Sequence, residues 1–128
     1  MLLPPHTEGS LATRDRGKLL CGYTALRTMM EIGDMISSLE IAIREKEKQK
    51  DIVEDLVRNA RTWFIPMLKL LLKMTPTVCP GVRETYVKIA MIHVDMLEDA
   101  LNRRNLEEAI ESIDKVREYL LRSFTKVG

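Results

Sequence analysis

Residues 62–81 read TWFIPMLKLLLKMTPTVCPG and form the most apolar run in the chain. They hold the only tryptophan, three of the five prolines and one of the two cysteines. A membrane-spanning helix needs roughly 20 mostly apolar residues, but Lys69 and Lys73 interrupt this run and Pro76 follows soon after. We therefore expect no transmembrane segment here, and we interpret residues 63–74 as a helix that packs among neighbouring helices.

Three prolines divide this segment. Pro66 falls inside the helical pattern, and it predicts a kink or a restart because proline has no N–H and crowds the carbonyl four residues earlier. Pro76 and Pro80 should move the preceding residues, Thr75 and Cys79, out of helical angles, which predicts a turn over residues 75–81. Pro80 also suits the first turn of the next helix.

Apolar spacing predicts further helices on both sides of this segment. From Lys18 to about Gln49 a stripe recurs at alternating intervals of four and three residues, at Ala25, Met29, Ile32, Ile36, Leu39 and Ile43. Residues 44–51, REKEKQKD, have no apolar member, so we place a break near Lys50; one uninterrupted helix over residues 18–64 is the alternative. Two more helices are predicted over residues 81–103 and 105–124.

Capping pairs mark two of the predicted helix starts. Asp51 is followed by Glu54, and Asn105 is followed by Glu108. In each pair the first side chain is expected to accept a hydrogen bond from a backbone N–H that the helix leaves unsatisfied.

These helices predict the fold class. Four helices joined by short links favour an all-α fold, an antiparallel up-and-down four-helix bundle. Residues 1–17, with two prolines and two glycines, are expected to form a short irregular N-terminal tail, and residues 18–128 a single helical-bundle domain.

Charge and cysteine content bear on partners and location. The 20 Lys and Arg residues against 19 Asp and Glu give a formal net charge of +1, without the basic excess of a dedicated nucleic-acid binder. Cys21 and Cys79 have no metal-site spacing and are too few for a disulfide framework, so we expect free cysteines in a reducing compartment. Because the first ten residues do not resemble a secretory signal, we expect a cytoplasmic location.

Motifs for chemistry are sparse, so we predict no catalytic residue, no metal site, no cofactor and no small-molecule ligand. The Cys79-Pro80 dipeptide fits a helix junction, and Cys79 itself is expected to behave as a small hydrophobic residue. His93 falls on the apolar side of its helix and lacks the glutamate three positions earlier that helical-bundle metal sites use. We expect an imidazole at the edge of the core, hydrogen-bonded to another helix.

One acidic segment resembles a known family. Residues 30–40, MEIGDMISSLE, are similar to the Glu-x-Gly-Asp helix segment of the all-α nucleotide pyrophosphohydrolases. The resemblance implies that Glu31 and Asp34, one helical turn apart, share a Mg²⁺ ion near a triphosphate. The family also has an acidic pair on a preceding helix, and residues 18–30 contain no carboxylate. A magnesium-dependent enzyme of this kind is therefore our third functional hypothesis.

Protein–protein contact is our first hypothesis, for a scaffold, an adaptor or a subunit of a larger assembly. A constant helical period over residues 53–71 buries Val53, Leu56, Val57, Ala60, Phe64, Met67, Leu68 and Leu71. Ile65 and Leu72 then lie on the opposite, basic side, where exposed apolar area would mark a partner site. The candidate contact residues, for a homo-oligomer or another protein, are Trp63, Ile65, Met67, Lys69, Leu72 and Lys73.

Nucleic-acid binding is the second hypothesis. It would use phosphate contacts from the basic side of the same helix, with no evident reader of bases. The residues are Arg58, Arg61, Lys69 and Lys73, combined with the basic segment RDRGK at residues 14–18.

Overall fold

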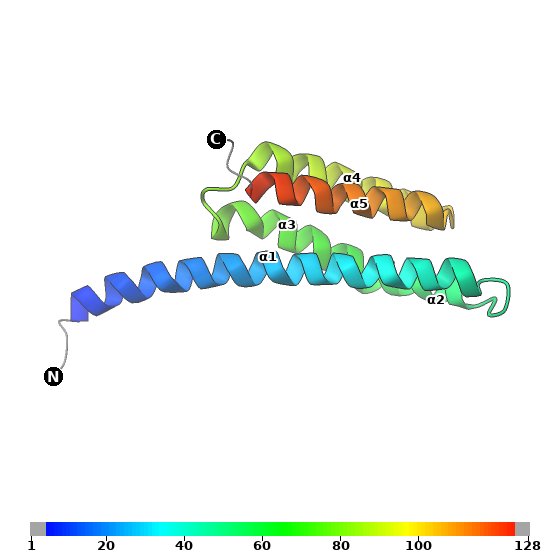
Figure 1. The fold of residues 1–128 in the computed structure, drawn as a ribbon, viewed down its shortest axis with the longest axis horizontal. Helices are drawn as coiled ribbons and strands as arrows, with labels where there is room; N and C mark the ends of the chain where they lie inside the picture. Colours follow the sequence, from blue (N-terminus) through cyan, green and yellow to red (C-terminus); the bar gives the residue numbers. More distant parts are fainter. Residues whose placement is uncertain (1–4, 125–128) are drawn as a thin grey trace.

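The computed structural model describes residues 5–124, with side chains from Arg16 onward. Its helices are α1 (Pro5–Glu45), α2 (Ile52–Asn59), the short π-helix η1 (Ala60–Phe64), α3 (Ile65–Val78), α4 (Glu84–Asn102) and α5 (Leu106–Phe124). Because α2, η1 and α3 follow one another without a gap, they form one bent rod, and the described chain makes four rods (Figure 1). Residues 5–124 contain no strand, so the predicted all-α four-helix bundle is confirmed.

The rods close into a ring around one core. Each rod packs against its neighbours in sequence, and α1 also packs against α5. Every helix contributes to a single hydrophobic cluster, whose fully buried members include Ile32, Leu39, Leu68, Leu72, Val94, Leu97, Ile113 and Leu120. α1 is the longest helix and continues past the others at the end of the bundle where both chain ends lie (Figure 1).

Helix boundaries confirm one prediction and correct another. α1 ends at Glu45 and α2 begins at Ile52, so the predicted break near Lys50 is confirmed and a single helix over residues 18–64 is wrong. Residues 5–17 belong to α1, so the predicted irregular tail is wrong over that range. Residues 1–4 of that prediction lie outside the described part of the chain.

The buried side of α1 is displaced from the predicted stripe. Ile32 and Leu39 are buried as expected, but the other buried positions differ from the predicted ones by one residue. The reason is that α1 carries apolar residues on several sides, so apolar spacing alone does not select the side that meets the core. The buried set is Thr24, Thr28, Ile32, Met35, Leu39 and Ala42.

A π turn bends the rod at η1. The Ile65 N–H donates to the Ala60 carbonyl, five residues back, so this turn holds one more residue than an α-helical turn. Pro66 follows at the start of α3, which confirms the predicted distortion at this proline. The extra residue rotates everything after it by about 100° relative to a constant α-helical period.

This rotation overturns the predicted exposure of two residues. Phe64 and Ile65 are consecutive, yet both are buried, and Leu72 is fully buried. Met67 and Leu71, which the constant period placed in the core, are only partly buried. Ile65 and Leu72 are therefore core residues of the bundle.

The turn between α3 and α4 follows the prediction in part. Cys79 leaves helical angles, with φ −125° and ψ 78°, as expected for a residue before proline. Pro76, however, lies inside α3, so Thr75 stays helical, and Pro80 lies in the turn before α4 rather than in its first helical turn. The Arg83 N–H donates to the Ser123 carbonyl at 2.9 Å, which joins the start of α4 to the end of α5.

Only one of the two predicted caps forms. The Glu108 N–H donates to Asn105 Oδ1 at 3.1 Å, and Asn105 Nδ2 donates back to the Glu108 carboxylate at 3.0 Å. Asp51 makes no side-chain cap hydrogen bond, and its own backbone is already helical, whereas a capping residue usually has extended angles. The Glu54 carboxylate bonds Arg104 rather than the Asp51 N–H.

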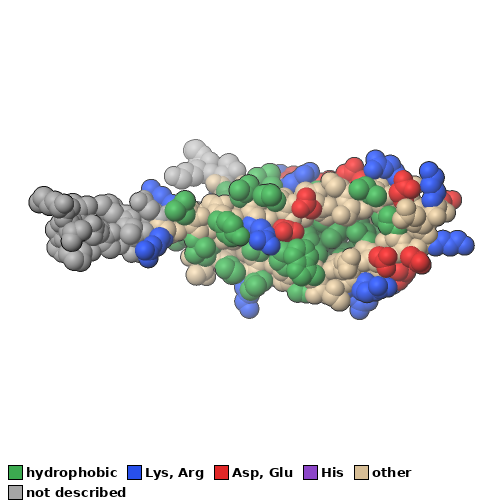
Figure 2. Space-filling model, turned by 90° about the horizontal axis from the view of Figure 1, so that it is seen from below, with side chains coloured by type: hydrophobic (Ala, Val, Ile, Leu, Met, Phe, Trp, Pro, Cys, Tyr) green, Lys and Arg blue, Asp and Glu red, His purple; other side chains and the backbone are tan. Residues whose placement is uncertain are grey.

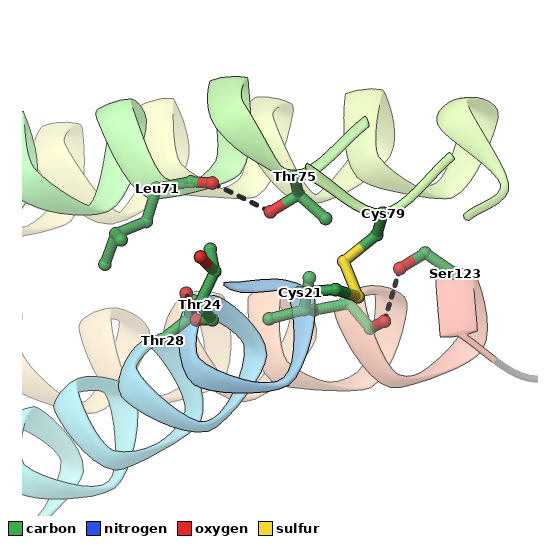
Figure 3. The surroundings of a disulfide bond; sticks show 8 residues. Cys21, Thr24, Thr28, Leu71, Thr75, Cys79 and Ser123 are labelled. Atoms are coloured by element: carbon green, nitrogen blue, oxygen red, sulfur yellow. Dashed lines mark hydrogen bonds between the residues drawn. A yellow bond between two sulfur atoms is a disulfide. The ribbon is translucent and has the colours of Figure 1, made fainter. Parts of the chain in front are cut away.

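A disulfide joins Cys21 in α1 to Cys79 at the end of α3 (Figure 3). The two Cα atoms are 5.1 Å apart, a normal separation for such a bond. The prediction of free cysteines, with Cys79 as a small unbonded hydrophobic residue, is therefore wrong.

Buried hydroxyl groups surround this bond at the same end of the core (Figure 3). Thr28 Oγ1 donates to the Thr24 carbonyl and Thr75 Oγ1 donates to the Leu71 carbonyl, both at 2.7 Å, and Ser123 Oγ bonds the Leu120 carbonyl. Each of these hydrogen bonds stays within one helix. None of them connects α1 to α3, and the disulfide adds a covalent link to the packing between these two helices.

Candidate interaction surface

The six contact residues predicted from the sequence do not form one surface. Ile65 and Leu72 are buried, Met67 and Lys69 are partly buried, and only Trp63 and Lys73 are exposed. Trp63 belongs to the π turn, and such turns are frequent at functional sites. An apolar surface, if it is to contact a partner, must include other residues.

The outer side of α1 supplies such residues. Leu19, Tyr23, Leu26 and Met30 recur at intervals of four, three and four, on the side of α1 opposite its buried residues, and each is more than half exposed. We call these four residues the α1 outer stripe. Their spacing is visible in the sequence, but the same helix carries a second apolar stripe with similar spacing, from which the core side was predicted.

Two residues of α3 add exposed apolar area. Leu70 and Met74 are exposed on α3, which packs directly against α1. Figure 2 views the molecule from below Figure 1, the side on which α1 lies. It shows hydrophobic side chains gathered over the half nearer the N-terminus, with charged side chains mostly at the other end.

Arg27 links Tyr23 of the α1 outer stripe to Glu31 through two side-chain hydrogen bonds. Arg27 donates to the Tyr23 hydroxyl at 3.2 Å and to the Glu31 carboxylate at 3.1 Å. These hydrogen bonds raise the pKa of the Arg27 guanidinium above its usual value, and the bond to Tyr23 has the larger effect. The Tyr23 ring lies at the surface as part of the stripe, with its hydroxyl hydrogen-bonded to Arg27.

The two carboxylates of the Glu-x-Gly-Asp segment line an open groove beside Trp63. This groove, of about 430 Å³, lies between α1 and the α2–η1 part of the bent rod, and its wall includes Glu31, Asp34, Ser38, Asn59 and Trp63. Over the described residues, no three His, Cys, Asp or Glu side chains come together as a metal site would require. The acidic pair that the resemblance would require on a second helix is not brought to this groove.

The basic side chains of the bent rod are partly neutralised. Lys69 lies 3.5 Å from Asp95 and 3.3 Å from Glu98, both in α4. Arg58 lies 3.5 Å from Asp55. Arg58 and Arg61 also share a cleft with the Glu54 and Glu98 carboxylates. A phosphate group would have to compete with carboxylates for most of these cations.

His93 lies in an aromatic column between α4 and α5. Its ring stacks on Tyr119 at 5.5 Å between centroids, and Tyr119 also lies 6.2 Å from Tyr86. His93 Nδ1 is buried and has no hydrogen-bond partner among the described residues. His93 therefore contacts the neighbouring helix by ring stacking. The sequence predicted a hydrogen bond to that helix instead.

No family model, curated protein or solved structure matches this chain. The candidate surface therefore has to be judged from its own residues.

A second hollow borders the disulfide. It measures about 800 Å³, and its lining includes Leu20, Cys21, Val78, Pro80 and Phe124. This hollow adds apolar area at the end of the bundle where the α1 outer stripe begins.

Within residues 5–124 no helix has both the length and the apolar character that a bilayer crossing requires.

Proposed function

We propose that this protein is a non-enzymatic helical bundle that acts through protein–protein contacts, as a scaffold, an adaptor or a subunit of a larger assembly. The observation that carries the proposal is the α1 outer stripe, which leaves four large apolar side chains exposed on one side of one helix. Leu70 and Met74 on the neighbouring α3 extend the apolar area. Contiguous exposed apolar surface on a folded protein marks interaction sites.

A matched pair of substitutions tests this proposal. Leu26→Asp places a charge in the stripe, whereas Ile92→Asp places one at an equally exposed position on α4. The wild-type chain and the Ile92 variant are expected to self-associate or to retain a protein partner, and the Leu26 variant is expected to lose that association. Size-exclusion chromatography with light scattering, together with affinity purification, measures both forms of association. A wild-type chain that stays monomeric and retains no protein would refute the proposal.

Location forms part of the proposal. The cytoplasmic location was expected from the lack of a secretory signal pattern and from cysteines taken to be free in a reducing compartment, and the Cys21–Cys79 bond removes the second of these reasons. Disulfides persist in oxidising compartments and in the cytoplasm of hyperthermophiles. We therefore propose a cytoplasmic location only if the protein comes from a hyperthermophile. Counting free thiols in protein extracted under acid quench from its native source checks whether the bond exists there.

The two other hypotheses have weaker support. Nucleic-acid binding has weaker support because three of the four basic side chains proposed for it, Arg58, Arg61 and Lys69, lie near carboxylates. Filter binding across a salt series would test it. Pyrophosphate release from nucleoside triphosphates with Mg²⁺, abolished by Glu31→Gln, would establish the enzyme hypothesis instead.

A further inference from the structure

We infer that the α1 outer stripe pairs with the same stripe of a second copy of this chain, with the two α1 helices antiparallel. This inference rests on the proposed function, because it names the partner of the same surface. It stands on the order of apolar residues along α1, on the charges beside them and on two glycines.

The apolar residues are self-complementary. In an antiparallel pair that places Leu19 opposite Met30 of the second copy, Tyr23 lies opposite Leu26 of that copy. All four side chains are exposed in the single chain, so every one of them gains burial in the pair. A two-fold axis then relates the two halves of the contact, which is the commonest arrangement for an assembly of identical chains.

Charges beside the stripe match the same register. Arg16 and Asp34 are both exposed, and they lie five helical turns apart, so both are on the same flank of the stripe. A two-fold axis perpendicular to antiparallel helices keeps each flank on its own side. Arg16 of one copy therefore comes within one residue of Asp34 of the other, and the symmetry makes this opposite-charge contact twice.

Glycines on the other flank allow close approach. Gly22 and Gly33 lie three helical turns apart on the flank away from Arg16. A Cβ atom added at either glycine would meet no atom within 4 Å, so packing inside the chain does not require glycine there. Glycine weakens a helix relative to alanine, and its lack of a side chain lets a second helix come nearer.

The first experiment measures the dimer and its dependence on the stripe. Analytical ultracentrifugation over a concentration series is expected to show a dimer for the wild-type chain and for Ile92→Asp. Leu26→Asp is expected to raise the dimer Kd by a factor of about 100 or more, because it places a charge at the centre of the contact. Circular dichroism confirms that each variant is folded, and Leu26 is exposed, so its substitution does not disturb the core.

Charge reversal tests the register. Arg16→Asp and Asp34→Arg are each expected to raise the dimer Kd roughly tenfold, since each turns two attractions into two repulsions. The double variant restores both pairs with their signs exchanged, and its Kd is expected to return to near the wild-type value. A double variant as weak as the single variants would overturn the proposed register.

A distance measurement tests the orientation. Spin labels attached through Ser37→Cys, an exposed position on α1, should lie about 37 Å apart along the axis of an antiparallel pair. A parallel pair would place the two labels side by side, and that result would overturn the inference.

The proposed function and this inference fail in different ways. A wild-type chain that is monomeric at all concentrations, but retains another protein through Leu26, overturns the second copy as the occupant and leaves the proposed function standing. A dimer that survives Leu26→Asp overturns the inference as well, because the contact then lies elsewhere. A monomeric chain that retains no protein overturns both.

Discussion

Arg104, in the turn between α4 and α5, has a φ of 58°, the one positive φ that the described residues show outside glycine. The Arg104 N–H donates to the Leu101 carbonyl and the Asn105 N–H to the Ala100 carbonyl, which is a helix ending usually completed by glycine. The Arg104 guanidinium donates to both carboxylate oxygens of Glu54 in α2, at 2.9 and 2.8 Å. The backbone at position 104 favours glycine, but the arginine there makes a contact with a distant helix that glycine could not make.

Two substitutions at Arg104 separate the backbone from the side chain. Arg104→Gly and Arg104→Ala both remove the ion pair with Glu54, but only glycine adopts the left-handed conformation without a Cβ clash. We expect the glycine variant to be more stable than the alanine variant by about 1 kcal/mol. Urea unfolding of the two variants measures this difference. Equal stabilities would contradict a left-handed backbone at this residue.

The same ion pair predicts a dependence on pH. Hydrogen bonds from Arg104 lower the pKa of Glu54 below its ordinary value. A lowered pKa in the folded state means that the pair stabilises the fold above the ordinary glutamate pKa of about 4.3, and that this contribution is lost as pH falls through the lower folded value. We expect Glu54→Gln to melt below the wild type at neutral pH, with the gap narrowing as pH falls below the ordinary glutamate range. Thermal melting across this range tests the prediction, and a constant gap would contradict it.

Local patterns predicted only part of the chemistry at individual residues. Asn105 with Glu108 and Asp51 with Glu54 show the same cap spacing, yet only the first pair forms a cap. In the second pair the Asp51 backbone is already helical, and the Glu54 carboxylate bonds Arg104, which lies 50 residues further along the chain. Spacing within one helix holds no information about the backbone angles of Asp51 or about a distant partner for Glu54.

At the scale of elements, regular periodicity predicted the helices and missed the π turn. Apolar spacing located the break near Lys50 and the predicted helices, because each helix buries one side in the same core. A constant period, however, placed Ile65 and Leu72 outside the core, since it assumed an equal number of residues in every turn. The apolar residues on two sides of the predicted helix were the visible sign of an extra residue in one turn.

Two leucines of α3 test the corrected register. Leu72 is 0% exposed and Leu70 is 57% exposed, although they lie two residues apart. We expect Leu72→Ala to lower the free energy of unfolding by about 2–5 kcal/mol, and Leu70→Ala to change it by no more than about 0.5 kcal/mol. Denaturant unfolding of both variants measures this contrast. The uncorrected helical period would place Leu72 at the surface and predict a small effect there.

At the scale of the whole molecule, the disulfide was the main feature that the sequence analysis missed. Cys21 and Cys79 each lie 29 residues from Lys50, where the chain turns back. An antiparallel hairpin symmetric about that residue brings the two cysteines opposite each other. The predicted break therefore contained the signal for the disulfide, which the spacing patterns of metal sites and disulfide frameworks do not include.

Reduction of this bond is expected to weaken the fold. The bond closes a loop with a sequence separation of 58, for which the chain-entropy model gives a stabilisation of about 4 kcal/mol. Equilibrium unfolding in urea, with and without a strong reductant, measures this contribution. The Cys21→Ala/Cys79→Ala double variant is the control, and its stability should not respond to reductant. A wild-type chain that also fails to respond would contradict the disulfide.

The candidate surface was predicted less well than the fold. Trp63 was expected at the surface and is exposed, but the α1 outer stripe was not identified. Burial depends on which side of α1 meets the other rods, and that choice places Thr24 and Thr28 inside while the stripe stays outside. Only the assembled bundle decides between two sides with similar apolar content.

The Cys21–Cys79 bond also divides the chain into a covalent ring and two open arms. α2, η1 and α3 lie within the ring, and α4 and α5 lie outside it. A pulling force applied to the chain ends passes through the bond and bypasses the ring. While the bond is intact, the unfolded chain is therefore shorter by about 200 Å of extended polypeptide. A single protease cut inside the ring likewise leaves the two fragments joined, and reduction alone releases them.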